Sequence, residues 1–243
     1  MLRLLDLESA RPVDDLVEFS LDEHRGGKRL MLNMVASLDG ATAFHGGATG
    51  LADDDDRAMF MALRSASDVI LVGAETVRAE DYGPVRLDPA AREARRRRGL
   101  EPLPELAIVT RTLDLDPDAR VFSDPERRPL ILTGADAPAD RRGALEDRAE
   151  IVEAGRIGAD PVTIVDVLTG RGHEVVLCEG GPTLNGQLVA ADLVDEIDLT
   201  LSPLMVAGQS SRVAHAPEVV SNAFHLSRVL VGDQMLFVRY LRD

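Results

Sequence analysis

The chain has 243 residues, a formal net charge of −15 at pH 7, 45% hydrophobic residues and only 3% aromatic residues. This composition argues against nucleic acid as a partner, because nucleic acid selects a basic face and often stacking aromatic rings. No apolar run approaches the ~18 residues of a membrane span, and no basic and apolar leader opens the chain. The single cysteine, Cys178, is expected to be a buried thiol. We therefore expect a cytoplasmic protein with no membrane partner.

Strand and helix patterns alternate through the first two thirds of the chain. The polar residues 1–27 are expected to form an N-terminal extension that ends in a turn. The patterns that follow predict a buried strand at 30–36, a glycine-rich loop at 41–50, a helix at 53–66, a strand at 69–73 and a short helix at 74–80. Next come a charged, solvated helix or loop at 91–99, strands at 105–110 and 129–133, a helix at 139–149 and an edge-like strand at 150–155.

The last third continues the alternation and then changes character. We expect a helix at 160–172, a strand at 174–181, a helix at 182–193, a long strand at 195–206 and two strands within 224–241 around a Gly-Asp turn. The sequence thus predicts an α/β fold: a mixed, mostly parallel sheet flanked by helices on both faces, with an antiparallel C-terminal hairpin. In such a sheet ligands bind at the carboxyl ends of the strands.

Two of the predicted strands end in polar or glycine-containing turns. In "NMVASLDG" the strand is followed at once by Ser37 and Asp39, which would also suit an ordinary turn. In "VILVGAETVRAE" the strand ends at Gly73, and backbone N–H groups of the next helix are candidates to bind a phosphate or carboxylate. An ordinary helix start capped by Thr76 is the alternative.

A third strand end, "CEGGPTLNGQ", has the features of an anion cradle. Gly180 and Gly181 allow close approach of a ligand, and Pro182 suits the first turn of a helix. The free N–H groups that follow would face a diphosphate. The pattern is not the G-x-G-x-x-G fingerprint, so a Rossmann domain is a poor match. Glu179 is costly at the end of a buried strand unless it pairs, binds a ligand or caps neighbouring amides.

Taken together, these blocks resemble the reductase domain of riboflavin biosynthesis, which has a dihydrofolate-reductase-like fold. The matching stretches are "NMVASLDG", "HGGATG", "LRSASDVILVGAETVRAE", "LAIVT", "CEGGPTLNGQLV" and "DLVDEIDLTLSPLMVAG", in order over residues 30–210. The deaminase signature H-x-E…P-C-x-x-C is absent, because Cys178 is the only cysteine. We therefore expect a stand-alone reductase with a single domain over residues 1–243.

The resemblance implies NADPH-dependent reduction of the ribosyl group of 5-amino-6-(5-phosphoribosylamino)uracil, with hydride passing to the sugar C1′. It places the cofactor against Val35, Gly50, Thr76, Glu80, Gly180, Gly181, Pro182, Thr183, Leu184, Asn185, Gly186 and Gln187. It places the substrate against Ser37, Ala48, Arg64, Arg86 and Glu179, with the two arginines on its phosphate. Asp39 and Glu179 are the candidate catalytic acids. A homodimer is expected, with the 195–206 strand or the closing hairpin as the contact.

Several positions depart from the family pattern, mostly on the substrate side. Ala41 stands where members have lysine, Ala48-Thr49-Gly50 replaces a Ser-x-Trp, and Glu80 replaces aspartate in a stretch that lacks the usual Asn-Pro. Two alternatives therefore stay open: a dihydrofolate or pterin reductase of the same fold, or a non-catalytic relative that binds NADPH.

Three further sets of charged residues have competing interpretations. Without the resemblance, Arg64 would be a surface helix residue and Arg86 a loop salt bridge. The basic run 92–98 would meet the 2′-phosphate of NADPH or a partner, but a solvated helix countered by Glu93 and Glu101 is favoured. The five histidines lack metal-ligand spacing, so no metal is expected.

Overall fold

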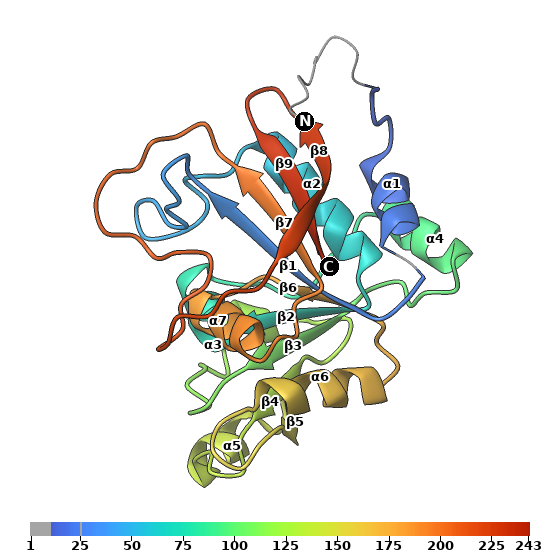
Figure 1. Cartoon of the computed structure of the whole chain (residues 1–243). Helices are drawn as coiled ribbons and strands as arrows, with labels where there is room; N and C mark the ends of the chain where they lie inside the picture. The colour runs from blue at the N-terminus through green and yellow to red at the C-terminus, as the bar shows by residue number, and fades with distance from the viewer. Residues whose placement is uncertain (1–10, 25) are drawn as a thin grey trace.

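A single sheet organises the computed structural model, which describes residues 11–24 and 26–243 (Figure 1). In space the nine strands of this described part follow the order β5-β4-β3-β2-β6-β1-β7-β9-β8. Their bounds are β1 Arg29–Ala36, β2 Val69–Gly73, β3 Glu105–Val109, β4 Leu130–Thr133, β5 Glu150–Glu153, β6 Val175–Cys178, β7 Glu196–Leu201, β8 Phe224–Val231 and β9 Leu236–Arg242.

The sheet is parallel from β5 to β7 and antiparallel at its C-terminal edge. Strands β1 and β2 both pair in parallel with β6, which brings their carboxyl ends together. Strand β9 pairs antiparallel with β7, and β8 with β9, forming the closing hairpin. The predicted mixed, mostly parallel sheet with an antiparallel C-terminal hairpin is therefore confirmed.

Helices cover both faces of the sheet. One face carries α1 Leu16–Glu23, α2 Asp54–Ala66, α3 Ala74–Ala79, α4 Pro89–Arg97 and α5 Ala139–Leu145, and the other carries α6 Pro161–Gly170 and α7 Pro182–Ala190. Side chains alternate between the faces along each strand. Ile70 and its register partner Leu177 point to the first face, whereas Leu71 and Cys178 point to the second.

Aspartates cap four of the described helices, two of them, α2 and α6, as the sequence predicts. The side chains of Asp15, Asp53, Asp88 and Asp160 accept hydrogen bonds from backbone N–H groups in the first turns of α1, α2, α4 and α6. Proline follows the aspartate in α4 and α6, where its missing N–H removes no helical hydrogen bond. These caps fix where the helices begin and therefore how their inner faces meet the sheet.

Three predictions about local structure were wrong or incomplete. The N-terminal extension contains α1, whose N-cap is Asp15; residues 1–10 and 25 of that extension lie outside the described part. Strand β7 ends at Leu201 instead of 206, because the chain after Ser202 turns to follow the loop that leaves β1. The predicted helix at 139–149 is shorter and ends at Leu145.

The basic run 92–98 is built into the fold rather than solvated throughout. The guanidinium of Arg95 is buried and donates to the backbone oxygens of Ser65, Ser67 and Glu101. Neighbouring arginines of the run pair with acids on α1 and before β4: Arg92 with Glu126, Arg97 with Glu18, and Arg98 with Glu18 and Asp22. Burial of Arg95 was not predicted, because a run of arginines is usually exposed.

Among residues 11–24 and 26–243, no helix is long and apolar enough to cross a bilayer.

Candidate functional site

The carboxyl ends of three adjacent strands form the edge of the sheet where the predicted site lies. Strand β6 lies between β1 and β2, so Glu179 and Gly180 emerge between the two other strand ends. Backbone hydrogen bonds fix this junction: Glu179 N donates to Leu71 O at 2.9 Å, and Gly73 N donates to Gly180 O at 2.7 Å.

Glu179 is the centre of a buried polar cluster at this edge. Arg64 donates from Nε to Oε1 and from Nη2 to Oε2, both at 2.7 Å, in a two-pronged ion pair. Tyr82 donates its hydroxyl to Oε2, also at 2.7 Å. The guanidinium carbon of Arg64 also lies 4.1 Å from the centroid of the Phe60 ring. The cluster joins α2, the segment after α3, and the end of β6.

The electrostatics of the cluster follow from burial and pairing. Burial opposes the charge on Arg64, but pairing with Glu179 outweighs it and raises the pKa of Arg64. Burial, followed by the charge of Glu179, raises the pKa of Tyr82 well above its ordinary value, so Tyr82 remains a phenol that donates. Side-chain exposure is 2% for Glu179 and 13% for Arg64, so the pair is shielded from water.

The two glycines after Glu179 are held closely against α3 and β1. Gly180 has a φ of +93°, a backbone conformation that favours glycine, and a Cβ there would lie 3.3 Å from Met34 Sδ. A Cβ at Gly181 would lie 2.7 Å from Thr76 Oγ1. The Gly180–Gly181 peptide bond is cis. The glycines thus let the start of α7 approach α3, whereas the sequence predicted that they allow close approach of a ligand.

Farther along α7, two predicted cofactor residues contact the segment that follows β7. Asn185 is fully buried, and its Nδ2 donates to Val213 O at 2.8 Å. A Cβ at Gly186 would lie 1.9 Å from His215 O, so this position requires glycine. Thr183 and Gln187 are exposed. The Asn185 side chain is therefore occupied by a contact within the protein.

Ser37 and Asp39 form a separate polar pair after β1. Ser37 Oγ donates to Asp39 Oδ1 at 2.5 Å, and Val206 N donates to the same oxygen at 3.0 Å. These two hydrogen bonds lower the pKa of Asp39, and the bond from Ser37 has the larger effect. The carboxyl of Asp39 is thus an acceptor at neutral pH.

The glycine-rich loop is tied to α3 through Glu80. Its Oε1 accepts a hydrogen bond from Ala48 N at 2.9 Å, and Gly50 packs against Phe44. Val35 lies half-buried in β1 opposite Thr200 of β7. The structure therefore brings the predicted loop residues Ala48 and Gly50 to the same side of the sheet edge as Thr76 and Glu80.

Arg86 is not brought to the Glu179 cluster. Its guanidinium pairs with Glu126 at 3.2 Å and donates to Asp124 O at 2.8 Å. Glu126 lies in the segment that enters β4, near the amino ends of the strands and away from the carboxyl ends. The contacts of Arg86 match the loop salt bridge that the sequence left as the alternative.

Sequence reasoning missed Tyr82 and Met34 as neighbours of the site. Tyr82 stands in "EDYGP", where the family pattern differs, and is one of two tyrosines in the chain. The preceding residue, Asp81, has a φ of +45°, so the chain turns sharply just before Tyr82. Met34 follows the alternation of β1, but nothing in its type indicated contact with Gly180.

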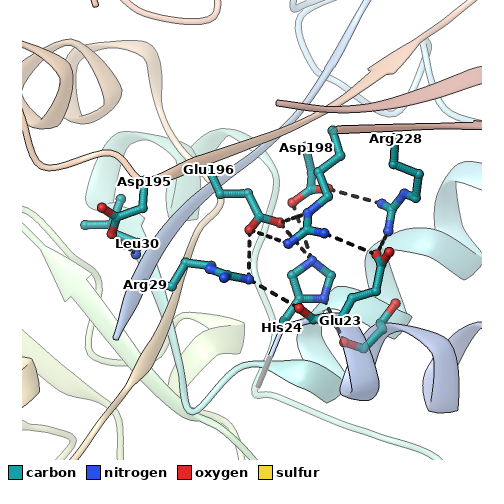
Figure 2. Close-up of polar contacts among 10 residues, drawn as sticks. Glu23, His24, Arg29, Leu30, Asp195, Glu196, Asp198 and Arg228 are labelled. Atoms are coloured by element: carbon teal, nitrogen blue, oxygen red, sulfur yellow. Dashed lines mark hydrogen bonds and ion pairs between the residues drawn. The ribbon is translucent and has the colours of Figure 1, made fainter. Parts of the chain in front are cut away.

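A second buried polar cluster joins the end of α1 to β7 and the C-terminal hairpin (Figure 2). His24, Glu196 and Asp198 point toward one another, with candidate ligand atoms all within 4.8 Å, the spacing of a metal site. However, Arg239 donates to both oxygens of Glu196 at 2.7 and 2.9 Å. Arg29, Arg228 and Arg239 already balance the nearby carboxylates, so the donor set favours ion pairing over a cation.

Comparison with solved structures supports the fold. A crystal structure of a pyrimidine reductase-like protein from Corynebacterium diphtheriae superimposes with a TM-score of 0.83 and 25% sequence identity. The match covers 89% of this chain and 92% of that one. The fold and the order of its elements are therefore shared over nearly the whole of both proteins.

Curated relatives and a family model match the same region. A 2,5-diamino-6-ribosylamino-4(3H)-pyrimidinone 5′-phosphate reductase from Methanothermobacter thermautotrophicus is 31% identical over 185 residues, covering 75% of this chain and 81% of the relative. The protein of the same name from Archaeoglobus fulgidus is 29% identical over 183 residues, with 75% and 83% coverage. The family model described as the RibD C-terminal domain matches residues 28–234. The chain therefore belongs to the RibD C-terminal domain family.

Proposed function

We propose that this protein is an NADPH-dependent reductase of a phosphoribosylamino-pyrimidine in the riboflavin pathway. The observation that carries the proposal is the buried Arg64–Glu179–Tyr82 cluster directly before Gly180 and Gly181. A polar group for substrate and a glycine turn for cofactor are adjacent at the carboxyl edge of the sheet, where ligands bind in such folds. The names of the archaeal relatives support the same reaction class.

The proposed cofactor fits the residues at the start of α7. The first N–H groups of a helix have no partner within the helix, and Asn185 N makes the first bond back to Gly181 O. The N–H groups of Thr183 and Leu184 therefore precede that bond and suit a diphosphate. Close packing of Gly181 on Thr76 aligns this turn beside α3. Val35, Gly50 and Glu80 complete the proposed cofactor surface.

On the substrate side, Glu179 would accept hydrogen bonds from the pyrimidine. Arg64 and Tyr82 would hold the carboxylate of Glu179 in place. Arg64 uses Nε and Nη2 for that pair, and its Nη1 is the proposed contact for the substrate phosphate. Ser37 and Ala48 lie on the two loops that would border the substrate. The contacts of Arg86 with Glu126 and Asp124 favour Arg64 over Arg86 in this role.

The bound nicotinamide would supply the hydride that reduces the sugar C1′ once the ribosyl ring has opened to its imine form. The protein contributes positioning and exclusion of water around the reacting atoms. A proton must also reach the imine nitrogen. Because the pKa of Asp39 is lowered, this residue suits holding an ordered water or substrate hydroxyl, with water delivering the proton. Glu179, the other candidate acid, accepts hydrogen bonds from Arg64 and Tyr82 on its two oxygens, so it suits an acceptor better than a proton donor.

A direct experiment can identify which pyrimidine base the substrate carries. The archaeal relatives carry the name of a reductase for the 2,5-diamino-pyrimidinone, whereas the sequence resemblance implied the deaminated uracil. We expect NADPH to be consumed when one of these two phosphoribosylamino compounds is added, and not with dihydrofolate. Turnover of dihydrofolate alone would contradict the proposal. NADPH binding with no turnover of any compound would indicate a non-catalytic relative.

We also propose a homodimer formed through the C-terminal hairpin. Strand β8 is an edge of the sheet, and Leu226, Val231 and Leu236 are exposed on the hairpin. Strand β7 lies between β1 and β9, so its edges are already paired and the hairpin is the better candidate. Sedimentation should give the mass of two chains, and a charge at Leu226 should give that of one. The cytoplasmic location expected from the sequence also stays a prediction.

A further inference from the structure

An irregular segment crosses the carboxyl edge of the sheet and contacts both halves of the proposed site. Residues 203–216, which we call the strap, follow β7 (Figure 1). One half of the strap is bonded to the loop that leaves β1, residues 37–50, which would border the substrate. The other half is bonded to helix α7, whose start would hold the cofactor diphosphate. The strap therefore connects the two halves of the site directly.

The strap fixes the position of Asp39 and of the loop that carries it. Val206 N donates to Asp39 Oδ1 at 3.0 Å. Farther along, Ser211 O accepts two hydrogen bonds from Thr42, one from its N at 3.2 Å and one from its Oγ1 at 2.9 Å. Thr42 is buried, so water competes little for these bonds. A shift of the strap would therefore move the carboxylate that we assign to an ordered water or substrate hydroxyl.

At its other end the strap packs on the first two turns of α7. Asn185 Nδ2 donates to Val213 O at 2.8 Å. His215 N donates to Pro182 O at 2.9 Å. The backbone of His215 also passes close over Gly186, because a Cβ at that glycine would lie 1.9 Å from His215 O. These contacts fix the strap to the start of the helix.

The side chain of Asn185 is held from its opposite end by strand β6. It is fully buried, and its Oδ1 accepts a hydrogen bond from Cys178 Sγ at 3.3 Å. Burial raises the pKa of Cys178 to about 12, so this residue stays a thiol that donates. The thiol takes the acceptor end of the amide and leaves the donor end for the strap. Asn185 thus joins the end of β6 to the strap.

We propose that Asn185 is a positioning residue: through the strap it keeps Asp39 and the loop that leaves β1 in place relative to the cofactor turn. The inference rests on the proposed function, because it takes the pyrimidine to lie at that loop and the nucleotide at the start of α7. A ligand that orders one end of the strap lowers the entropy that the other end loses on binding. Nucleotide and pyrimidine therefore each raise the affinity of the protein for the other, by the same factor.

Calorimetry on the whole chain measures this coupling. The two phosphoribosylamino-pyrimidines are titrated in turn, with and without saturating NADP+, which has no hydride to donate. We expect NADP+ to raise the affinity of wild-type protein for the pyrimidine at least about fivefold, the lower end of typical coupling between sites. In Asn185→Ala the factor should fall below about twofold, because the amide that holds the strap is gone. The Kd for NADP+ alone should change by less than about threefold.

A second variant acts on the strap from its other end. Thr42→Val removes the hydroxyl that bonds Ser211 O, keeps the shape of the side chain, and should lose the coupling as the first variant does. In steady-state kinetics both variants should raise the KM for the pyrimidine about fivefold, as loss of one buried hydrogen bond does, with the KM for NADPH unchanged. Two matched controls should behave as wild type: Asn222→Ala, beyond the strap, and Thr169→Val, in α6.

The outcomes separate this inference from the proposed function. If wild-type protein fails to bind nucleotide or pyrimidine, the proposed function is wrong and the inference falls with it. If both bind but NADP+ leaves the affinity for the pyrimidine unchanged, the inference alone is wrong. A large loss of NADP+ affinity in Asn185→Ala, with the coupling intact, would mean that Asn185 binds the cofactor directly and would also overturn the inference. If Asn185→Ala does not fold, Thr42→Val decides: loss of coupling supports the inference, and wild-type coupling contradicts it.

Discussion

Arg64 donates two hydrogen bonds of 2.7 Å to the two oxygens of Glu179, a residue 115 positions later in the chain. The pair connects helix α2 to the end of β6 and lies immediately before the Gly180–Gly181 turn. Breaking it would leave one buried charge without a partner. The coupling energy between Arg64 and Glu179 can therefore be measured without any substrate.

The first prediction concerns the stability of this pair. Arg64→Met and Glu179→Gln should each lower the free energy of unfolding by about 3 kcal/mol, because each leaves a buried charge uncompensated. The double variant should lose at least about 1 kcal/mol less than the sum of the singles. Urea unfolding measures all three. The exposed pair Arg148–Asp118, changed to methionine and asparagine, should show a coupling below about 1 kcal/mol. Additive losses at Arg64 and Glu179 would contradict the account.

The second prediction concerns Tyr82 as a positioning residue for Glu179. Tyr82→Phe removes one hydrogen bond to Glu179 Oε2 and should lower stability by about 1–2 kcal/mol. If the bond orients Glu179 toward the pyrimidine, the KM for substrate should rise several-fold while the Kd for NADPH stays unchanged. Tyr240→Phe, in β9, is the matched control. A fall in stability with an unaltered KM would mean that Tyr82 acts only in folding.

The third prediction concerns the close contact at Gly181. Its φ of −81° accommodates alanine, so the main consequence of Gly181→Ala is a methyl group 2.7 Å from Thr76 Oγ1. We expect weaker NADPH binding, because the start of α7 must move away from α3. Adding Thr76→Ala should restore part of the affinity if the contact is the cause. Gly143→Ala, where nothing lies within 4 Å, should leave NADPH binding unchanged. Normal affinity in Gly181→Ala would show that the cradle tolerates a displaced helix.

The fourth prediction concerns acid stability and involves Glu105, which begins β3 away from the proposed site. Burial opposes its charge, but His173 and Arg171 outweigh burial and lower the pKa of Glu105 from 4.5 to about 2. A lowered carboxyl pKa stabilises the fold above the unfolded value and is lost as the pH falls through the folded value. Glu105 should therefore contribute about 3 kcal/mol at neutral pH, lost between pH 4.5 and about 2.

Glu105→Gln tests that contribution by denaturant unfolding across the same pH range. The variant should be less stable at pH 7 and should show a shallower fall in stability as the pH drops below 4.5. Glu93→Gln, at an exposed position of α4, is the control and should behave as wild type. Parallel pH curves for Glu105→Gln and wild type would show that the Glu105 network does not govern acid stability.

Much of the fold could be predicted because its strands are short apolar runs between clear turn residues. The positions of β1, β2 and β6, and the proline at the start of α7, follow from local patterns. Helix α1 was missed because its sequence, "LVEFSLDE", lies in a polar extension. Its Glu23 and His24 meet partners on β7, β8 and β9 that lie about 170 or more residues away in the chain.

The site could be predicted in part, for the same physical reason. Strand ends and glycines are local signals, so Gly180, Gly181 and Thr76 were predicted as site residues, and the structure packs Gly181 against Thr76. Whether an arginine faces a ligand depends on which acids lie nearby in space. Arg64 meets Glu179, whereas Arg86 meets Glu126, and no local pattern distinguishes the two arginines. The position of Tyr82 also depends on the path of the chain after α3.

The most direct measurement follows the hydrogen that the proposed reaction transfers. NADPH carrying deuterium at both C4 positions of its nicotinamide would be incubated with the protein and each phosphoribosylamino-pyrimidine, and the products analysed by mass spectrometry and NMR. The account predicts one deuterium at C1′ of a ribitylamino product from at least one of the two compounds, and far less product from Glu179→Gln. A folded wild-type protein that binds NADPH but forms no ribitylamino product, or forms one without deuterium at C1′, would contradict it.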